Sequence, residues 1–171
     1  YAYFKELNGP RTDIDTLRKN RRARVVELVL EQPILPGVRD YLSEAKQIGL
    51  KIGLASSSGG DYVRGHLKRL ELFDYFHVTK CFEVTEVHKP DPQPYLAVLD
   101  AMGVSPGEAV AFEDSPNGVA AARAAGIFCV AVPNPMTACL SLGHAHLSLP
   151  SLADEPLSQL LSRACGADRN G

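Results

Sequence analysis

The sequence contains no run of apolar residues long enough to cross a bilayer, no signal-peptide pattern and no excess of positive charge. A membrane-spanning helix needs about 20 consecutive apolar residues, and a secreted protein begins with a short basic and apolar leader. The formal net charge of -2 disfavours a nucleic-acid ligand, because phosphate backbones are bound by an excess of Lys and Arg. We therefore expect a soluble, cytoplasmic protein that binds neither membranes nor nucleic acids.

The sequence also lacks closely spaced cysteines. Its four cysteines are scattered along the chain, at Cys81, Cys129, Cys139 and Cys165. Disulfide frameworks and zinc sites use cysteines at short, regular spacings, and no CxxC pair occurs here. The thiols are therefore expected to be reduced, as in a cytosolic compartment.

Two nucleotide-binding motifs are absent as well. Neither GxGxxG nor GxxxxGK[ST] occurs, which disfavours a dinucleotide site and a P-loop. The chain of 171 residues, 45% of them hydrophobic, is nevertheless long enough to bury the core of one domain with a small appendage.

Helical and strand-like patterns alternate from about residue 34 onward. Short apolar runs typical of buried strands lie at residues 49–55, 76–79, 109–112 and 127–132, with a weaker one at 146–149. Helices are expected over residues 38–47, 60–70, 92–102, 117–125 and 157–164. Apolar strands separated by helices imply a parallel sheet that is covered on both faces. We predict an α/β protein with a doubly wound, Rossmann-like parallel sheet over residues 34–171.

Residues 1–33 follow a different pattern. A long amphipathic helix is predicted over about residues 14–31, where apolar residues recur at helical spacing, and Thr12 with Asp15 resembles a capping box. The polar face of this helix is basic, with Arg18, Lys19, Arg21, Arg22 and Arg24. Such a face could meet an acidic partner or an anionic ligand, but we favour a solvated face, which is the commoner case.

Two adjacent carboxylates, Glu113 and Asp114, follow the strand predicted at residues 109–112. Ligands of open α/β sheets bind at the carboxyl ends of strands, and carboxylate oxygens suit a hard divalent cation such as Mg²⁺. The alternative is an acidic turn in which Asp114 or Ser115 only caps the next helix.

Hydroxyl groups follow the strand predicted at residues 49–55, at Ser56, Ser57 and Ser58. They are followed by Gly59 and Gly60, where a helix begins, and free N–H groups at a helix amino terminus bind anions. The alternative is that one of these serines, such as Ser58, only caps the helix.

Lys89 lies in the turn His88-Lys89-Pro90-Asp91-Pro92. The prolines restrict the backbone on both sides, so the lysine side chain starts from a rigid point. A lysine held in this way can neutralise a phosphoryl group beside carboxylates, although a single lysine is more often an ordinary surface residue.

Taken together, these three stretches resemble the second, third and fourth motifs of the haloacid dehalogenase superfamily. They are most similar to the branch that contains β-phosphoglucomutase and small sugar-phosphate phosphatases. The resemblance extends from about Ile34 to Pro135, and residues 1–33 resemble the last part of the helical cap of this branch.

The resemblance implies a role for each residue of the site. Ser56 and Ser57 would bind the phosphoryl group, and Lys89 would balance its charge and act with Ser56 as a catalytic residue. Glu113 and Asp114 would hold Mg²⁺. The reaction of the family is attack by an aspartate on phosphorus, which gives an aspartyl phosphate. The phosphoryl group is then transferred to water or to a sugar hydroxyl. The implied substrate is a small phosphorylated metabolite, a sugar or polyol phosphate.

The first motif of the family, Asp-x-Asp-Gly-Thr at the end of a first strand, does not occur in this sequence. The stretch Asp13-Ile14-Asp15-Thr16-Leu17 mimics it, but no apolar strand precedes it and no glycine follows it. The missing strand would lie between the strands that precede Ser56 and Glu113. We expect the chain to be truncated at its amino end, without its nucleophile, and to be inactive alone.

We therefore predict a Mg²⁺-dependent phosphomonoester hydrolase whose nucleophile lies outside this chain. Two alternatives stay open: a β-phosphoglucomutase-like phosphotransferase, and a non-catalytic phosphate-binding remnant. We expect the protein to be a monomer.

Overall fold

The computed structural model describes residues 13–82 and 86–167, and the chain divides into two compact units, Tyr1–Pro33 and Ile34–Gly171. In the first unit, the described part is the helix α2 (Ile14–Leu30) with its flanking residues. The helix begins at Asp13, whose carboxylate accepts hydrogen bonds from the N–H groups of Asp15 and Thr16. The cap predicted at Thr12 lies outside the described residues.

No residue of α2 is buried: Ile14 and Val29 are half-buried, and the other residues of the helix are exposed. The basic residues of α2 are exposed, and two of them form ion pairs within the helix, Arg18 with Asp15 and Arg24 with Glu27. A solvated basic face fits these contacts. The assignment of the first unit to a cap stays a prediction.

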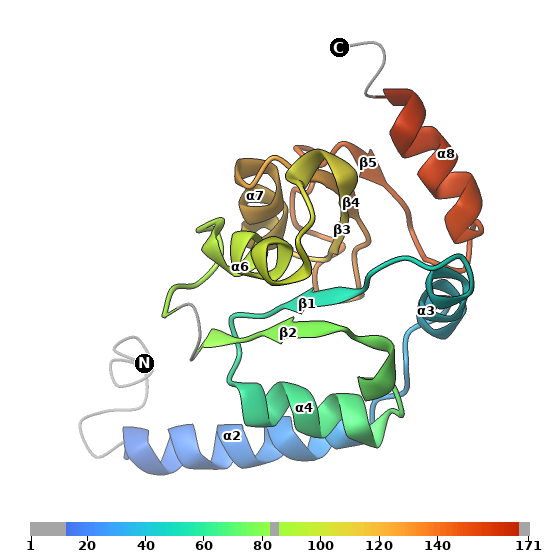
Figure 1. Cartoon of the computed structure of the whole chain (residues 1–171). Coiled ribbons are helices and arrows are strands. Elements are labelled where there is room, and N and C mark those ends of the chain that lie inside the picture. The colour runs from blue at the N-terminus through green and yellow to red at the C-terminus, as the bar shows by residue number, and fades with distance from the viewer. Residues whose placement is uncertain (1–12, 83–85, 168–171) are drawn as a thin grey trace. The chain divides into compact units, whose positions relative to one another are not determined.

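The described residues of the second unit form five short parallel strands in two sheets (Figure 1). They are β1 (Gly53–Ala55), β2 (Val78–Lys80), β3 (Val110–Glu113), β4 (Phe128–Ala131) and β5 (Leu147–Ser148). β1 pairs with β2, with Gly53 opposite Val78. In the second sheet β4 lies between β3 and β5, with Val110 opposite Phe128 and Val130 opposite Leu147.

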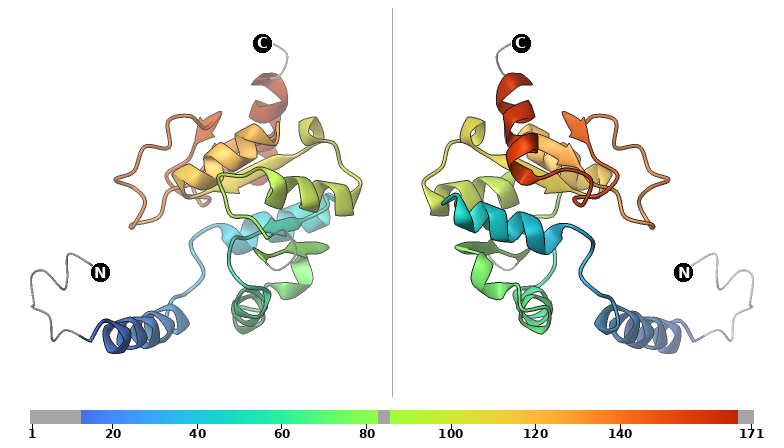
Figure 2. Two further views of the ribbon diagram at one scale, coloured as in Figure 1. Left: turned by 90° about the vertical axis from the view of Figure 1, so that its left-hand side faces the viewer. Right: turned by 90° about the vertical axis from the view of Figure 1, so that its right-hand side faces the viewer.

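Helices cover both faces of these strands. They are α3 (Val38–Gln47), α4 (Gly60–Arg69), α6 (Gln93–Met102), α7 (Pro116–Ala124) and α8 (Leu157–Ala167), with 3-10 turns η1 (Phe73–Tyr75) and η2 (Pro106–Glu108). Figure 2 shows α6 and α7 in front from one side of the unit, and α3 and α8 in front from the other. This is the covered parallel sheet that the sequence predicted.

The core has two layers, because successive side chains of a strand point to opposite faces. Ala111 and Cys129 pack with Leu99 of α6 and Val119 of α7 in one buried cluster. Val130 packs in a second cluster, with buried residues of α3 and α8. Burying a Val or Leu side chain stabilises a fold by about 1.5–3 kcal/mol, so both faces of β4 anchor the unit.

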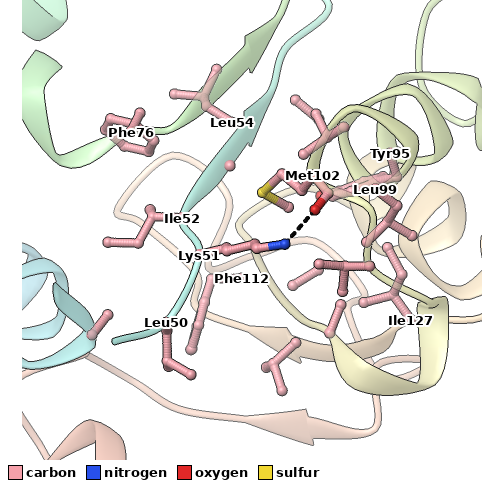
Figure 3. A pocket seen from close by; sticks show the side chains of 18 of the residues that line it. Leu50, Lys51, Ile52, Leu54, Phe76, Tyr95, Leu99, Met102, Phe112 and Ile127 are labelled. Atoms are coloured by element: carbon pink, nitrogen blue, oxygen red, sulfur yellow. Dashed lines mark hydrogen bonds between the residues drawn. The ribbon is translucent and has the colours of Figure 1, made fainter. Parts of the chain in front are cut away.

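The two sheets are separated by a cavity of about 690 Å³ between β1 and β3. Its walls are mainly apolar and also come from α3 and α6; Figure 3 shows Ile52, Leu99 and Phe112 around it. Phe112, in the middle of β3, is 37% exposed, although its neighbour Ala111 is buried. The sheet is therefore interrupted between β1 and β3, where the resemblance predicts one more strand.

The structure differs from the sequence prediction at the ends of several elements. β2 begins at Val78 rather than at Phe76. His77, just before it, contacts Ile52 twice: its N–H donates to the carbonyl of Ile52, and its Nδ1 accepts from the N–H of Ile52. The cap of α4 is Gly59 and not Ser58. A capping box between Ser105 and Glu108 precedes β3. None of the described helices is both long and apolar enough to span a membrane.

Candidate active site

The serine, lysine and carboxylate motifs come together at the carboxyl ends of β1 and β3. The backbone N–H of Lys89 donates to Oγ of Ser57, just after β1, with a distance of 3.0 Å. The ammonium group of Lys89 forms an ion pair with Oε1 of Glu113, the last residue of β3. Lys89 thus links the two sheets, and Ser56 and Asp114 are the sequence neighbours of the residues that it contacts.

Glu113 is buried, with 7% of its side chain exposed, and one of its two carboxylate oxygens accepts two hydrogen bonds. Oε1 accepts hydrogen bonds from the ammonium of Lys89 and from the hydroxyl of Tyr95. A buried carboxylate is costly unless it is paired and hydrogen-bonded, and these two donors meet that requirement. Lys89 also lies 4.6 Å from the centre of the Tyr95 ring, so Tyr95 contacts both members of the ion pair.

The second oxygen of Glu113, Oε2, lies over the start of α7. Oγ of Ser115 is 3.5 Å from it, and a Cβ atom at Gly118 would lie only 1.8 Å from it. Only glycine at this position leaves room for the carboxylate. Ser115 is the N-cap of α7 and accepts a hydrogen bond from the N–H of Gly118. The helix-cap interpretation therefore holds for Ser115, and it leaves both carboxylates free of that task.

Asp114 is exposed, and its partner is the side chain of Asn134. Nδ2 of Asn134 donates to Oδ2 of Asp114 with a distance of 2.6 Å. Oδ1 of Asn134 accepts hydrogen bonds from the N–H groups of Met136 and Thr137, which fixes the amide in the loop after β4. Asn134 thereby holds Asp114 from a third strand end.

Ser56 and Ser57, which follow β1, are half-buried and accept hydrogen bonds from backbone N–H groups. Oγ of Ser56 accepts a hydrogen bond from the N–H of Ser58, 3.1 Å away, and Ser57 accepts the bond from Lys89. An oxygen that accepts a hydrogen bond keeps its own O–H as a donor. Both hydroxyls therefore have a proton that can be donated to an anion.

Burial and the nearby carboxylate control the ionisation of two neighbours of Glu113. Burial, followed by the charge of Glu113, raises the pKa of the Tyr95 phenol far above its usual range. The same two causes raise the pKa of the Cys129 thiol to about 12. Tyr95 is therefore a hydroxyl donor, and Cys129 a neutral thiol, at any physiological pH.

Glu113 and Asp114 have the hard oxygen donors that Mg²⁺ prefers. Within residues 13–82 and 86–167, no group of three or more His, Cys, Asp or Glu side chains is arranged to hold a metal ion. The pair fits a magnesium ion in chemical type, but it needs further oxygen ligands to complete an octahedral set.

Sequence reasoning did not identify Tyr95 and Asn134. Tyr95 lies in the first turn of α6, among apolar residues that pack in the core. The sequence pattern therefore does not distinguish it from a residue with a packing role. Asn134 could have been found, because it follows β4 at the sheet edge that also carries Ser56 and Asp114.

One further motif is present on paper, since residues 103–107 read Gly-Val-Ser-Pro-Gly and match the GxSxG pattern of hydrolase elbows. In the structure Ser105 caps the turn η2, which lies before β3. An elbow serine follows a strand and precedes a helix, so Ser105 is a structural cap.

Comparison with known proteins identifies the family of the chain. The sequence profile of the haloacid dehalogenase-like hydrolases matches residues 2–126. The chain is 43% identical over 161 residues to "Putative phosphatase YhcW" of Bacillus subtilis (strain 168), which covers 94% of this chain and 73% of that protein.

Two further relatives match over about half of their own length. Hexitol phosphatase B of Escherichia coli (strain K12) is 40% identical over 66% of this chain and 51% of that protein. Beta-phosphoglucomutase of Bacillus subtilis (strain 168) is 35% identical over 67% of this chain and 50% of that protein.

A solved structure shares the fold. It is CbbY from Rhodobacter sphaeroides in complex with xylulose-(1,5)bisphosphate, with a TM-score of 0.74, 28% sequence identity, and coverage of 89% of this chain and 70% of that chain. The resemblance predicted from the three motifs is confirmed: the chain belongs to the haloacid dehalogenase-like hydrolase family.

Proposed function

We propose that the protein is a Mg²⁺-dependent phosphomonoester hydrolase that acts on a small phosphorylated sugar or polyol through an aspartyl phosphate. One observation carries this proposal: Lys89 is bonded at its backbone to the Ser57 loop and at its side chain to Glu113. A cation, hydroxyl donors and two carboxylates thereby share one edge of the fold. The names of the relatives supply the substrate class, since they include a hexitol phosphatase and a phosphoglucomutase.

Each residue of the cluster has a task in phosphoryl transfer, which is catalysed mainly by positioning and by stabilising negative charge. The hydroxyls of Ser56 and Ser57 donate to oxygens of the phosphoryl group. The ammonium of Lys89 neutralises part of the charge of the phosphoryl group, to which it donates the N–H groups that are not bonded to Glu113. Glu113 and Asp114 would hold Mg²⁺, which would offset the charge on the phosphoryl oxygens.

The nucleophile of this reaction is an aspartate outside the described residues. The cavity between β1 and β3 is the place for the strand that carries it, because its mainly apolar walls suit a central strand. A strand there would pair with both neighbours and end at the edge where Ser56 and Glu113 lie. Phosphoryl transfer to the aspartate, and then to water, would take place at that edge.

The test is hydrolysis of a panel of hexose, pentose and hexitol phosphates by the protein made from the complete gene, with Mg²⁺ and with EDTA. We expect phosphate release that requires Mg²⁺ and is lost in Lys89→Ala and Asp114→Asn. Lys68→Ala is the matched control, because Lys68 is an exposed lysine of α4 outside the cluster. Hydrolysis that survives Lys89→Ala, or no hydrolysis of any substrate, would contradict the proposal.

The similarity to beta-phosphoglucomutase supports a second candidate, transfer of the phosphoryl group to a sugar. The two functions differ in the final acceptor. Incubation of a hexose 1-phosphate with the complete protein gives free phosphate if water is the acceptor, and a hexose 6-phosphate if the sugar is. The product distinguishes them directly.

A further inference from the structure

Within the part of the chain that the structure describes, Tyr95 is the one aromatic residue that contacts both Lys89 and Glu113. It lies in the first turn of α6, and its hydroxyl donates to Oε1 of Glu113. Its ring lies under the ammonium of Lys89, whose Nζ is also 3.4 Å from the hydroxyl oxygen. A purely packing role would need the ring but not the hydroxyl.

The hydroxyl gives the two oxygens of Glu113 different environments. Oε1 accepts two hydrogen bonds, from Tyr95 and Lys89, whereas the Ser115 hydroxyl lies at the long distance of 3.5 Å from Oε2. A carboxylate anchored through one oxygen cannot rotate freely, so the other oxygen has a fixed direction. Oε2 is thereby the oxygen that a cation can use.

The hydroxyl also relieves Lys89 of part of the work of holding Glu113. Tyr95 is a neutral donor to the carboxylate. Without it, the ammonium of Lys89 would be the main donor to Oε1. The lysine would then be drawn toward Glu113 and away from a bound anion.

We infer that the Tyr95 hydroxyl is a positioning group that anchors Glu113 through Oε1, so that Oε2 is left for a divalent cation and Lys89 for the phosphoryl group. This inference rests on the proposed function for its kinetic consequence. Its consequence for cation binding is independent of any substrate. The test therefore measures both.

The variant is Tyr95→Phe in the protein made from the complete gene, since phenylalanine keeps the ring and removes only the hydroxyl. We expect Mg²⁺ affinity, measured by calorimetric titration, to fall at least tenfold, in the range of 10–100-fold typical for loss of a group that orients a metal ligand. We expect kcat to fall by a similar factor and KM for the substrate to rise, because Lys89 is drawn away from the phosphoryl group.

The matched control is Tyr41→Phe. Tyr41 is a buried tyrosine of α3 whose hydroxyl donates to the carbonyl of Glu155, 2.9 Å away and outside the cluster. Loss of that hydroxyl is expected to lower the melting temperature and to leave Mg²⁺ affinity unchanged. Equal Mg²⁺ affinities for Tyr95→Phe and the wild type would overturn the inference, and so would equal losses in both tyrosine variants.

A double-mutant cycle with Glu113→Ala separates positioning from a structural effect. If Tyr95 acts through Glu113, the Phe substitution has little further effect on Mg²⁺ affinity once Glu113 is gone. Additive losses would show that Tyr95 acts by another route and would overturn the inference. If the wild type hydrolyses no phosphorylated metabolite, the proposed function fails, while the titrations still decide the role of Tyr95.

Discussion

Glu113 and Asp114 are adjacent in sequence but lie in contrasting regions of the molecule. Glu113 is buried and contacts three parts of the chain: Lys89 in the loop before α6, Tyr95 in α6, and Ser115 at the start of α7. Asp114 is exposed, and Asn134 in the loop after β4 holds it.

The difference follows from the cost of burying charge. A buried carboxylate must be paired with a cation and hydrogen-bonded, or the fold loses several kcal/mol. An exposed carboxylate is hydrated and needs no such support. A change at Glu113 should therefore affect both the stability of the fold and the function of the site, whereas a change at Asp114 should affect the site alone.

The largest expected effect tests this contrast directly. Glu113→Gln leaves the largely buried ammonium of Lys89, whose side chain is 15% exposed, without its counter-charge, and we expect it to lower the free energy of unfolding by about 3 kcal/mol. Asp114→Asn should lower it by less than about 0.5 kcal/mol, as is usual for a surface substitution. Urea unfolding of the complete protein measures both. Similar losses in the two variants would contradict the contrast between buried and exposed carboxylates.

Gly118→Ala sharpens the comparison, because it affects Glu113 and leaves the chemistry of both carboxylates intact. The added methyl would lie 1.8 Å from Oε2, so the carboxylate must move. We expect phosphatase activity to fall on the order of 100-fold, and overpacking to lower stability by about 1–3 kcal/mol.

The control for this variant is Gly65→Ala, where a Cβ atom meets no other atom within 4 Å. Gly65 lies in α4, so alanine there should raise helix stability by about 1 kcal/mol and leave activity unchanged. A Gly118→Ala variant as active as Gly65→Ala would show that Glu113 tolerates displacement.

A second contrast, between local motifs and contacts of distant residues, explains how much of the site could be predicted from sequence. Ser56, Lys89 and Glu113 were recognisable because each lies in a short local motif at a predicted strand end or in a rigid turn. The contacts of Tyr95 and Asn134 join residues 18 and 20 positions apart along the chain. No local pattern encodes contacts between such distant positions, since they depend on how the helices and loops pack.

The fold itself was predictable for a similar reason. The apolar runs of β3 and β4 carry a strong local signal because these strands are covered on both faces, and their predicted positions agree with the structure. The start of β2 was not predictable, because an apolar residue such as Phe76 gives the same local signal just before a strand as within it.

A smaller effect is expected on the exposed side of the comparison. Asn134→Ala removes the hydrogen bond to Asp114, and we expect Mg²⁺ affinity to fall about tenfold. Calorimetric titration of the complete protein measures it. Asn134→Asp is the control, because its carboxylate still accepts the bonds from Met136 and Thr137 but no longer donates to Asp114. If Asn134→Asp binds Mg²⁺ as the wild type does, Asn134 acts through its loop and not through Asp114.

The smallest effect concerns Glu44, a carboxylate with a structural role outside the site. It accepts hydrogen bonds from the N–H groups of Leu157 and Ser158 at the start of α8, and the bonds from Ser158 lower the pKa of Glu44 below its ordinary value of 4.5. The folded protein therefore binds its proton less tightly than the unfolded chain does. The resulting stability is fully present above pH 4.5 and is lost as the pH falls through the lowered pKa.

Glu44→Gln removes this pH dependence, so its melting temperature should fall less steeply than that of the wild type on going from about pH 5 to about pH 3. Mg²⁺ affinity should be unchanged, because Glu44 lies at the contact of α3 with α8 and not at the site. A Glu44 variant that loses Mg²⁺ affinity as Asp114→Asn does would show that general acidity of the surface, and not the geometry around Glu113 and Asp114, attracts the cation.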